Sequence, residues 1–187
     1  MNLWDTRTTS HKPIQTLTEA RDTVSTLAVH LPTYSIVSGS YDGCVRVYDI
    51  RMGKITTDIV AFPVTSVRSS MDGNALLTST LDGRIRMLDR SDGTLLKAFG
   101  GGGGYRNREM RIRSVFAWGD AAVLSGSEAD DDGQARVFAW DVLGGEVVDV
   151  VNAGEGVKVV SCVAWNEKGP CWAGGCSDGM FYTCLFG

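Results

Sequence analysis

The sequence lacks the features that mark several common classes of protein. No apolar run reaches the roughly 18 residues of a membrane-spanning helix, so no span is expected. Residues 1–13 have neither an apolar core nor a basic start, so they do not resemble a signal peptide. The formal net charge of −4 gives no electrostatic reason to expect nucleic acid as the main partner. We therefore expect a cytoplasmic or nuclear protein, without membrane or direct nucleic-acid contacts.

Residue types that carry catalysis or bind metals are also sparse. Only two histidines occur, His11 and His30, and neither matches a serine–aspartate pair, so nucleophilic catalysis is not expected. No two cysteines are spaced as CxxC, the close pairing that zinc ligands usually show. The five cysteines are Cys44, Cys162, Cys171, Cys176 and Cys184. Their odd number, without a secretory signal, indicates reduced thiols, which we expect to be small buried strand residues. No enzyme activity, cofactor or metal is predicted.

What the sequence does contain is a recurring hairpin, seen best in Ile36–Arg51, which reads IVSGSYDGCVRVYDIR. A small apolar run leads into Asp42-Gly43, and a β-branched and aromatic run follows. Asp-Gly between two such runs predicts a tight hairpin, because both turn positions need residues that tolerate positive φ. No segment shows a helical period, and short strands alternate with turn residues throughout. These patterns indicate an all-β protein.

The hairpin recurs in Leu76–Arg90, Val123–Val142 and Trp172–Leu185. Aligning their turn aspartates, Asp42, Asp82, Asp132 and Asp178, gives spacings of 40, 50 and 46 residues. A period near this length, with an aromatic-Asp strand end, is typical of the WD-repeat blade, one four-stranded sheet of a β-propeller. The length of 187 residues allows a sizeable core.

The chain is predicted to form a single partial WD-repeat propeller over residues 1–187. Trp4-Asp5 matches the end of a blade strand with nothing before it, so residues 1–18 are interpreted as remnant strands. The repeat units cover about 13–50, 54–90, 94–142 and 146–187, and the strands number seventeen in all. Propellers close at about four to eight blades. We expect about four blades from the C-terminal part of a seven-bladed ring.

In well-formed WD blades, a loop histidine, a serine or threonine, the turn aspartate and the tryptophan form a buried hydrogen-bond network. The matching positions here are Ser38, Asp42, Tyr48, Thr78, Asp82, Ser125, Asp132, Trp140 and Asp178. The loop histidine is missing from every repeat, Tyr48 and Leu88 stand in place of tryptophan, and Gly174 replaces the hydroxyl residue. These positions are predicted to be structural rather than catalytic.

Beyond the general repeat, the order of residues is distinctive in seven stretches: Trp4–Arg7, Pro13–Val29, Ser38–Lys54, Thr78–Leu96, Asn107–Ser114, Val137–Glu146 and Gly156–Gly187. In these stretches the chain resembles the mitogen-activated protein kinase organizer family of WD-repeat proteins. The stretches cover nearly the whole chain but only the later repeats of that family's ring. The resemblance implies a scaffold that holds kinases of the extracellular-signal-regulated cascade together. Members of the family also occur among spliceosome components, which leaves splicing factors as alternative partners.

Two surface features are candidates for partner binding. Ile36–Arg51 also resembles the box by which some WD-repeat proteins bind the adaptor of a cullin-RING ubiquitin ligase, and Arg51 is the residue that goes beyond the ordinary blade pattern. Separately, Gly100–Gly104, which we expect to be a flexible loop rather than a phosphate cradle, precedes a basic run. That run contains Arg106, Arg108, Arg111 and Arg113, and an acidic run in the same unit contains Glu128, Asp130, Asp131 and Asp132. Both runs are expected on one rim, either as a self-compensating patch or as a docking surface centred on Arg106 and Arg108.

Overall fold

The computed structural model describes residues 1–169 and 171–185, which form strands and turns without an α-helix. No helix in this part of the chain is long and apolar enough to cross a membrane. The strands are β1 (Asn2–Leu3), β2 (Gln15–Thr16), β3 (Val24–His30), β4 (Ser35–Ser40), β5 (Cys44–Asp49), β6 (Lys54–Ile59), β7 (Val64–Ser69), β8 (Ala75–Thr80), β9 (Arg84–Asp89), β10 (Leu95–Gly100), β11 (Ser114–Ala117), β12 (Ala122–Gly126), β13 (Arg136–Asp141), β14 (Val147–Asn152), β15 (Val160–Asn166), β16 (Cys171–Cys176) and β17 (Phe181–Leu185).

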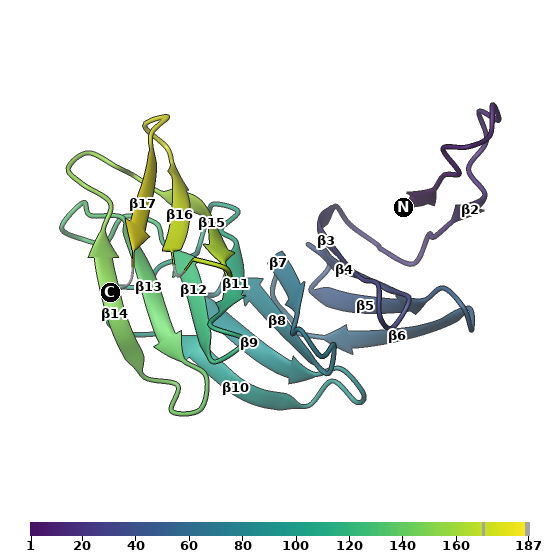
Figure 1. Cartoon of the computed structure of the whole chain (residues 1–187), viewed down its shortest axis with the longest axis horizontal. Coiled ribbons are helices and arrows are strands. Elements are labelled where there is room, and N and C mark those ends of the chain that lie inside the picture. Colours follow the sequence, from purple (N-terminus) through teal and green to yellow (C-terminus); the bar gives the residue numbers. More distant parts are fainter. Residues whose placement is uncertain (170, 186–187) are drawn as a thin grey trace.

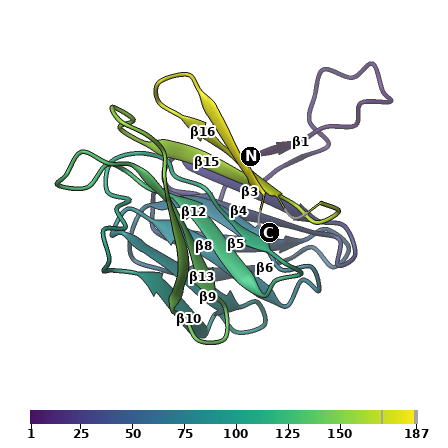
Figure 2. The same ribbon diagram turned by 60° about the vertical axis from the view of Figure 1, so that its left-hand side comes forward.

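The strands form consecutive antiparallel sheets that follow one another around an arc (Figure 1). The sheets β3–β6, β7–β10 and β11–β14 each have four strands, and β15–β17 has three among the described residues. The first strands of these sheets, β3, β7, β11 and β15, lie along the inner side of the arc. Short β1 and β2 pair with each other, and the loop between them projects away from the sheets (Figure 2). The predicted all-β WD-repeat fold of about four blades is confirmed.

In the first three blades, side-chain burial decreases from the second strand to the outermost strand. Every residue of β4 and β12 is buried, as is nearly every residue of β8, whereas the outer strands β6 and β14 alternate between exposed and half-buried residues. The buried strands are rich in small residues because neighbouring sheets approach them closely. A Cβ added to Gly126 on β12, for example, would collide with the backbone carbonyl of Val160 on β15. Small residues at these positions therefore set the spacing between blades.

Each blade is joined to its neighbour through a layer of apolar side chains. Val37 and Val45 of the first blade pack with Val64, Val67 and Leu76 of the second. The second and third blades share a cluster that contains Leu77, Ile85, Phe99, Val123 and Phe138, and the third and fourth share one that contains Leu124, Val137, Val160, Val163 and Trp172. Burial of these apolar surfaces is the main force that stacks the sheets.

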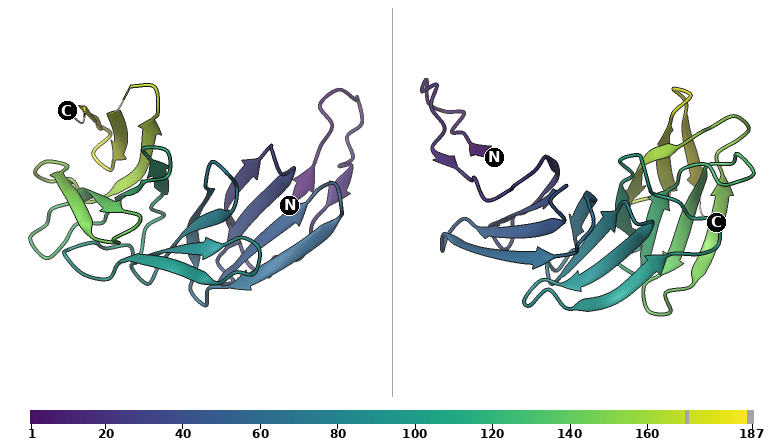
Figure 3. Two further views of the ribbon diagram at one scale, coloured as in Figure 1. Left: turned by 60° about the horizontal axis from the view of Figure 1, so that its bottom comes forward. Right: turned by 180° about the vertical axis from the view of Figure 1, so that it is seen from behind.

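The repeat units read from the sequence are offset from the sheets. The unit 54–90 begins with β6, which pairs with β5 and so completes the sheet before it. In the same way, β10 pairs with β9, and β14 pairs with β13. The N-terminal segment contacts the first blade through side chains, since Leu17, Met1 and Leu3 pack with Ile36 and Tyr48. Figure 3 shows the ribbon from two further sides, with this segment at the N-terminal end of the arc. Each repeat is therefore tied to two sheets.

The cysteines differ from the expectation of small buried residues. Cys162 is exposed, and Cys44, Cys171 and Cys176 are only half-buried, all as free thiols. The Cys184 side chain lies outside the part that the structure describes. The difference for Cys162 arises on β15, where burial is confined mainly to Val160 and Val163.

Candidate interaction surface

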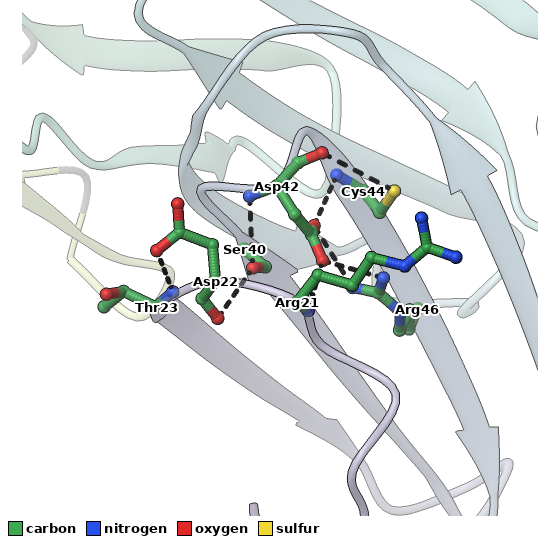
Figure 4. A network of polar contacts seen from close by, with 7 residues as sticks. All are labelled: Arg21, Asp22, Thr23, Ser40, Asp42, Cys44 and Arg46. Atoms are coloured by element: carbon green, nitrogen blue, oxygen red, sulfur yellow. Dashed lines mark hydrogen bonds and ion pairs between the residues drawn. The ribbon is translucent and has the colours of Figure 1, made fainter.

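The turn between β4 and β5 holds a buried ion pair (Figure 4). The Asp42 carboxylate accepts hydrogen bonds from the Arg46 guanidinium, at 2.8 and 3.2 Å, and from the backbone amides of Arg21 (2.9 Å) and Cys44 (3.1 Å). Burial alone would raise the pKa of Asp42, but these donors outweigh it and lower the pKa to about 2. Asp42 thereby ties the loop before β3 to the hairpin of its own blade.

A serine hydroxyl completes this network on its other side. The Ser40 hydroxyl donates to the Asp22 carbonyl at 3.2 Å and accepts the Asp42 amide at 3.3 Å. Figure 4 shows Ser40 between the loop residue Asp22 and the turn. The network therefore satisfies the polar groups of a turn whose residues, Ser40 to Cys44, are buried or half-buried.

The second blade repeats this arrangement. The Asp82 carboxylate forms an ion pair with the Arg86 guanidinium, 2.5 Å away, and accepts a hydrogen bond from the Thr80 hydroxyl. The Thr80 hydroxyl oxygen in turn accepts a hydrogen bond from the Arg86 guanidinium at 2.6 Å. Burial opposes ionisation of Asp82, but Arg86 and Thr80 together hold its pKa below the usual value. The two blades thus use the same hydroxyl–carboxylate–guanidinium set at the same turn.

In the third blade the sequence alignment selected the wrong aspartate. Arg136 pairs with Asp130, 2.5 Å away, and its amide donates to the Ser127 hydroxyl at 3.0 Å. Asp132 is exposed, and its amide only donates to Asp130 at 3.1 Å. The turn is two residues longer than those of the first two blades, so the carboxylate equivalent to Asp42 lies earlier in the chain. Asp130 therefore replaces Asp132 in the blade network.

The predicted hydroxyl residues also lie elsewhere. Ser38 and Thr78 are buried on the central strands, and the Thr78 hydroxyl has no hydrogen-bond partner in the described part of the chain. Ser38 lies beside Tyr48, whose pKa is raised by burial. The hydroxyls that contact the turn network are two residues later in the chain, at Ser40, Thr80 and Ser127. They share a strand face with the predicted residues, because side chains two residues apart point the same way, and they reach the network because they lie nearer the turn, at or just after the strand ends.

Tyr105 occupies the interior of the third blade, in the loop where a WD blade would carry its histidine. The Tyr105 and Ser125 hydroxyl oxygens are 3.3 Å apart. The Tyr105 ring meets Trp140 edge-on at 5.2 Å and Phe138 at 5.6 Å between ring centroids. Burial raises the pKa of Tyr105. The predicted residues Ser125 and Trp140 are thus brought together, through a tyrosine that the sequence analysis did not select.

The turn of the fourth blade has only the local part of this network. Asp178 is exposed, and its carboxylate accepts the amide of Met180 at 2.9 Å. Tyr182 stands where the first three blades carry arginine, three residues after the turn glycine. The Gly-x-x-Arg spacing is the signal that identifies Arg46, Arg86 and Arg136 from the sequence, and it is missing here.

Arg51, the candidate ligase-adaptor residue, stacks on an aromatic ring. Its guanidinium carbon lies 3.6 Å from the centroid of the Tyr34 ring, and its amide donates to Asp49 at 2.9 Å. Tyr34 is 48% exposed, so the stack lies on the surface. The β5–β6 turn that carries Arg51 is at the opposite end of the sheet from the Asp42 turn, because the strands are antiparallel.

The basic and acidic runs of the third unit do meet. Arg106 forms an ion pair with Asp131 at 2.5 Å, and the Glu128 carboxylate accepts three successive amides, Arg108 to Met110, at 2.7 to 2.9 Å. Arg106, Arg108 and Asp131 also line a cleft of about 470 Å³ beside the glycine loop. Four glycines of this loop have positive φ: Gly100, Gly101, Gly103 and Gly104. Of the four arginines, Arg106 alone pairs with an acidic side chain of the run in the described part of the chain, while Arg111 donates to the Tyr41 hydroxyl and the Arg108 side chain is exposed. The patch is therefore compensated only at Arg106, and the docking interpretation stays a prediction.

Taken together, the turn carboxylates are committed to arginines and backbone amides. In the described part of the chain, no group of three or more His, Cys, Asp or Glu side chains has a geometry that could hold a metal ion. What the arrangement provides is a rigid set of sheets with charged and aromatic side chains at both ends. Such surfaces suit binding of other macromolecules.

Comparison with known proteins agrees with this architecture. The family model described as WD domain, G-beta repeat matches residues 11–49 and 56–89. The chain is 38% identical to WD repeat domain-containing protein 83 of Rattus norvegicus over 88% of its length, and 39% identical to that of Homo sapiens over 86%. It is also 40% identical to an uncharacterized WD repeat-containing protein of Schizosaccharomyces pombe over 73%. These matches cover 49%, 47% and 42% of the relatives, so the chain spans about half of their length or less. The chain is a WD-repeat protein.

Proposed function

We propose that the chain is a non-enzymatic scaffold that binds protein partners through the loops and turns of its blades. The observation that carries this proposal is the use of the turn carboxylates. Asp42, Asp82 and Asp130 are each paired with an arginine of their own blade, so they build the sheet rather than carry out chemistry. WD repeats in general serve as interaction modules, and the relatives have no enzymatic names.

For the partners, we propose components of a mitogen-activated protein kinase cascade. This part of the proposal rests on the family resemblance in stretches such as Ser38–Lys54 and Thr78–Leu96, which include two complete blade turns. The likeness to relatives covers only about half of their length, so it supports the platform more than the partner. We place this activity in the cytoplasm, the nucleus or both.

Two alternatives predict different partners. A role in pre-mRNA splicing predicts spliceosome proteins. A role as substrate receptor of a cullin-RING ligase predicts adaptor binding through Arg51, and the 3.6 Å stack on Tyr34 opposes it, because a partner has to displace or include that ring.

Affinity purification of the tagged chain followed by mass spectrometry tests the proposal. We expect enrichment of kinases of the cascade over a tag-only control. Two charge-reversal variants serve as controls for each other: Arg51→Glu at one end of the sheets, and Arg106→Glu with Arg108→Glu at the other. Recovery of splicing factors or ligase subunits in place of kinases selects the alternatives. Recovery of no protein above the tag-only control contradicts the scaffold proposal itself.

A further inference from the structure

The inner strands of the first two blades border a cavity of about 510 Å³. Its lining consists of Val24–Leu27 on β3, Ser66 and Arg68 on β7, Arg113 just before β11, and Met1. These strands lie along the inner side of the arc in Figure 1. A volume of this size is within the range of cavities that bind small ligands or a few side chains.

The charges of this cavity are all positive. Arg68 and Arg113 contribute guanidinium groups, and the lining contains no carboxylate. Neither guanidinium forms an ion pair with a residue in the described part of the chain, whereas Arg46, Arg86 and Arg136 each have an aspartate partner. Arg68 is half-buried, so its charge has lost part of its hydration without a compensating anion.

The other polar groups of the cavity are largely committed to the protein. The Ser25 hydroxyl donates to the carbonyls of Val64 and Gly39, and the Thr26 hydroxyl accepts the Val67 amide at 3.3 Å. Backbone contacts also fix the position of Arg113, whose amide donates to the Ser161 carbonyl at 3.0 Å. The two guanidiniums are therefore the charged side-chain groups available to bind a ligand. Arg68 is held on β7, and the backbone of Arg113 is anchored beside β15.

We propose that this cavity binds an anionic side chain, a phosphate or a carboxylate, on a segment of a partner protein. Arg68 and Arg113 hold the anion, because guanidinium groups match the geometry of phosphate and carboxylate oxygens with paired hydrogen bonds. Leu27, which is 47% exposed, and Val24 contact an apolar neighbour of that side chain. The inference rests on the proposed scaffold function, and it defines the chemistry of one partner.

Fluorescence anisotropy with short labelled peptides tests this inference. The probes are Gly-Leu-phosphoSer-Leu-Gly and the same peptide with glutamate or with unmodified serine at the centre. The variants are Arg113→Glu and Arg68→Gln, compared with Arg84→Glu. Arg84 is an exposed arginine on β9, it forms no ion pair with a described residue, and it lies outside this cavity, so its reversal matches the charge change of Arg113→Glu.

We expect the phosphoserine or glutamate peptide to bind, and the serine peptide to bind at least about tenfold more weakly. Arg113→Glu and Arg68→Gln lower the affinity by about tenfold or more, and Arg84→Glu changes it by less than about twofold. Phosphoserine binding without glutamate binding identifies phosphate as the anion, and similar binding of both identifies a shared anion site. Because Arg113 is exposed, Arg113→Glu is expected to keep the circular dichroism and melting temperature of the wild type, which separates lost binding from lost folding.

Several outcomes overturn the inference: binding of neither anionic peptide, equal binding of the serine peptide, or equal losses in Arg113→Glu and Arg84→Glu. Displacement of the peptide by oligouridylate at lower concentration than by unlabelled peptide also overturns it, since the cavity then prefers nucleic acid. Affinity purification with Arg113→Glu separates the two proposals. If the variant recovers every wild-type partner, the inference fails and the scaffold function stands. If the wild type recovers none, the scaffold function fails.

Discussion

Asp42 and Arg46 form an ion pair in which both side chains are almost completely buried, with 8% and 5% of their surfaces exposed. Asp42 lies in the β4–β5 turn and Arg46 on β5, and the carboxylate also accepts the backbone amides of Arg21, in the loop before β3, and of Cys44, at the start of β5. A charge in such a place is tolerated because its partner and hydrogen bonds replace the lost water. The pair is therefore a structural unit whose halves depend on each other.

The first prediction concerns the removal of one charge from this pair. Asp42→Asn leaves the Arg46 guanidinium buried without its anion, and we expect the free energy of unfolding to fall by about 3 kcal/mol. The measurement is urea denaturation at neutral pH. Asp132→Asn is the matched control, because Asp132 is an exposed turn aspartate, and a change of less than about 0.5 kcal/mol is expected. Equal losses in the two variants would contradict the assignment.

A second prediction follows from the pKa of Asp42, which is about 2 in the folded chain. The unfolded carboxyl has a pKa near 3.9, so the unfolded chain takes up a proton first as the pH falls. The contribution of this pair is therefore present above about pH 4 and is lost as the pH falls toward 2. The pH-dependent contribution of the pair to the free energy of unfolding is at most about 2 kcal/mol, because solvent screens part of the interaction. Urea denaturation from pH 6 to pH 2 should show the stability difference between wild type and Asp42→Asn narrowing on acidification, and a constant difference would disprove it.

Local signals in the sequence identified the first two turns, and a longer loop misled the alignment in the third. Asp42-Gly43 and Asp82-Gly83 put the carboxylate directly before the glycine, so the nearest aspartate was the right one. In Asp130–Gly133 the carboxylate that pairs with Arg136 lies three residues before the glycine, so Asp132-Gly133 marks the turn but not the paired aspartate. Counting three residues on from the turn glycine finds Arg46, Arg86 and Arg136, whereas the choice of Asp130 over Asp131 and Asp132 requires the structure.

Contacts between distant strands could not be read in this way. Tyr105 reaches Ser125 because the loop before β11 folds into the blade, and no spacing rule states that in advance. Arg68 and Arg113 border one cavity because the inner strands of successive sheets lie together. Such relations depend on the angle and distance between sheets, which follow from the packing of all blades at once.

A third prediction concerns the aromatic centre of the third blade. Tyr105→Phe removes the hydroxyl contact with Ser125 and should cost about 1 kcal/mol of unfolding free energy. Tyr105→Ala also removes the ring that packs on Trp140 and Phe138, and should cost about 3–5 kcal/mol. Thermal and urea denaturation measure both values. The Ser125 hydroxyl also donates to the Gly126 carbonyl at 2.9 Å, so Ser125→Ala should still be destabilising in the Tyr105→Phe background, but less than in the wild type. Equal losses in the two backgrounds would show that the two hydroxyls act independently.

A fourth prediction concerns the spacing between the third and fourth blades. At Gly126 a Cβ would collide with the backbone of Val160, and the backbone has little room to move, so Gly126→Ala should cost about 1–3 kcal/mol. Gly102→Ala is the control, since Gly102 has neither a positive φ nor an atom within 4 Å of an added Cβ. Its effect is expected to stay within about 0.5 kcal/mol. Hydrogen exchange should place the loosening by Gly126→Ala in β12 and β15.

The last prediction concerns Arg51 and Tyr34. The guanidinium stacks on the ring at 3.6 Å, and an exposed contact of this kind is worth about 0.5–1 kcal/mol. A double-mutant cycle with Arg51→Ala and Tyr34→Ala should return a coupling energy in this range, because each single change removes the same contact. If Arg51 also binds a ligase adaptor, Tyr34→Ala should change adaptor recovery in affinity purification, since the ring holds the guanidinium in place. A coupling energy near zero would mean that Arg51 is free of the ring in solution. In that case the stack could no longer be used as an argument against adaptor binding, and Arg51→Glu alone would decide it.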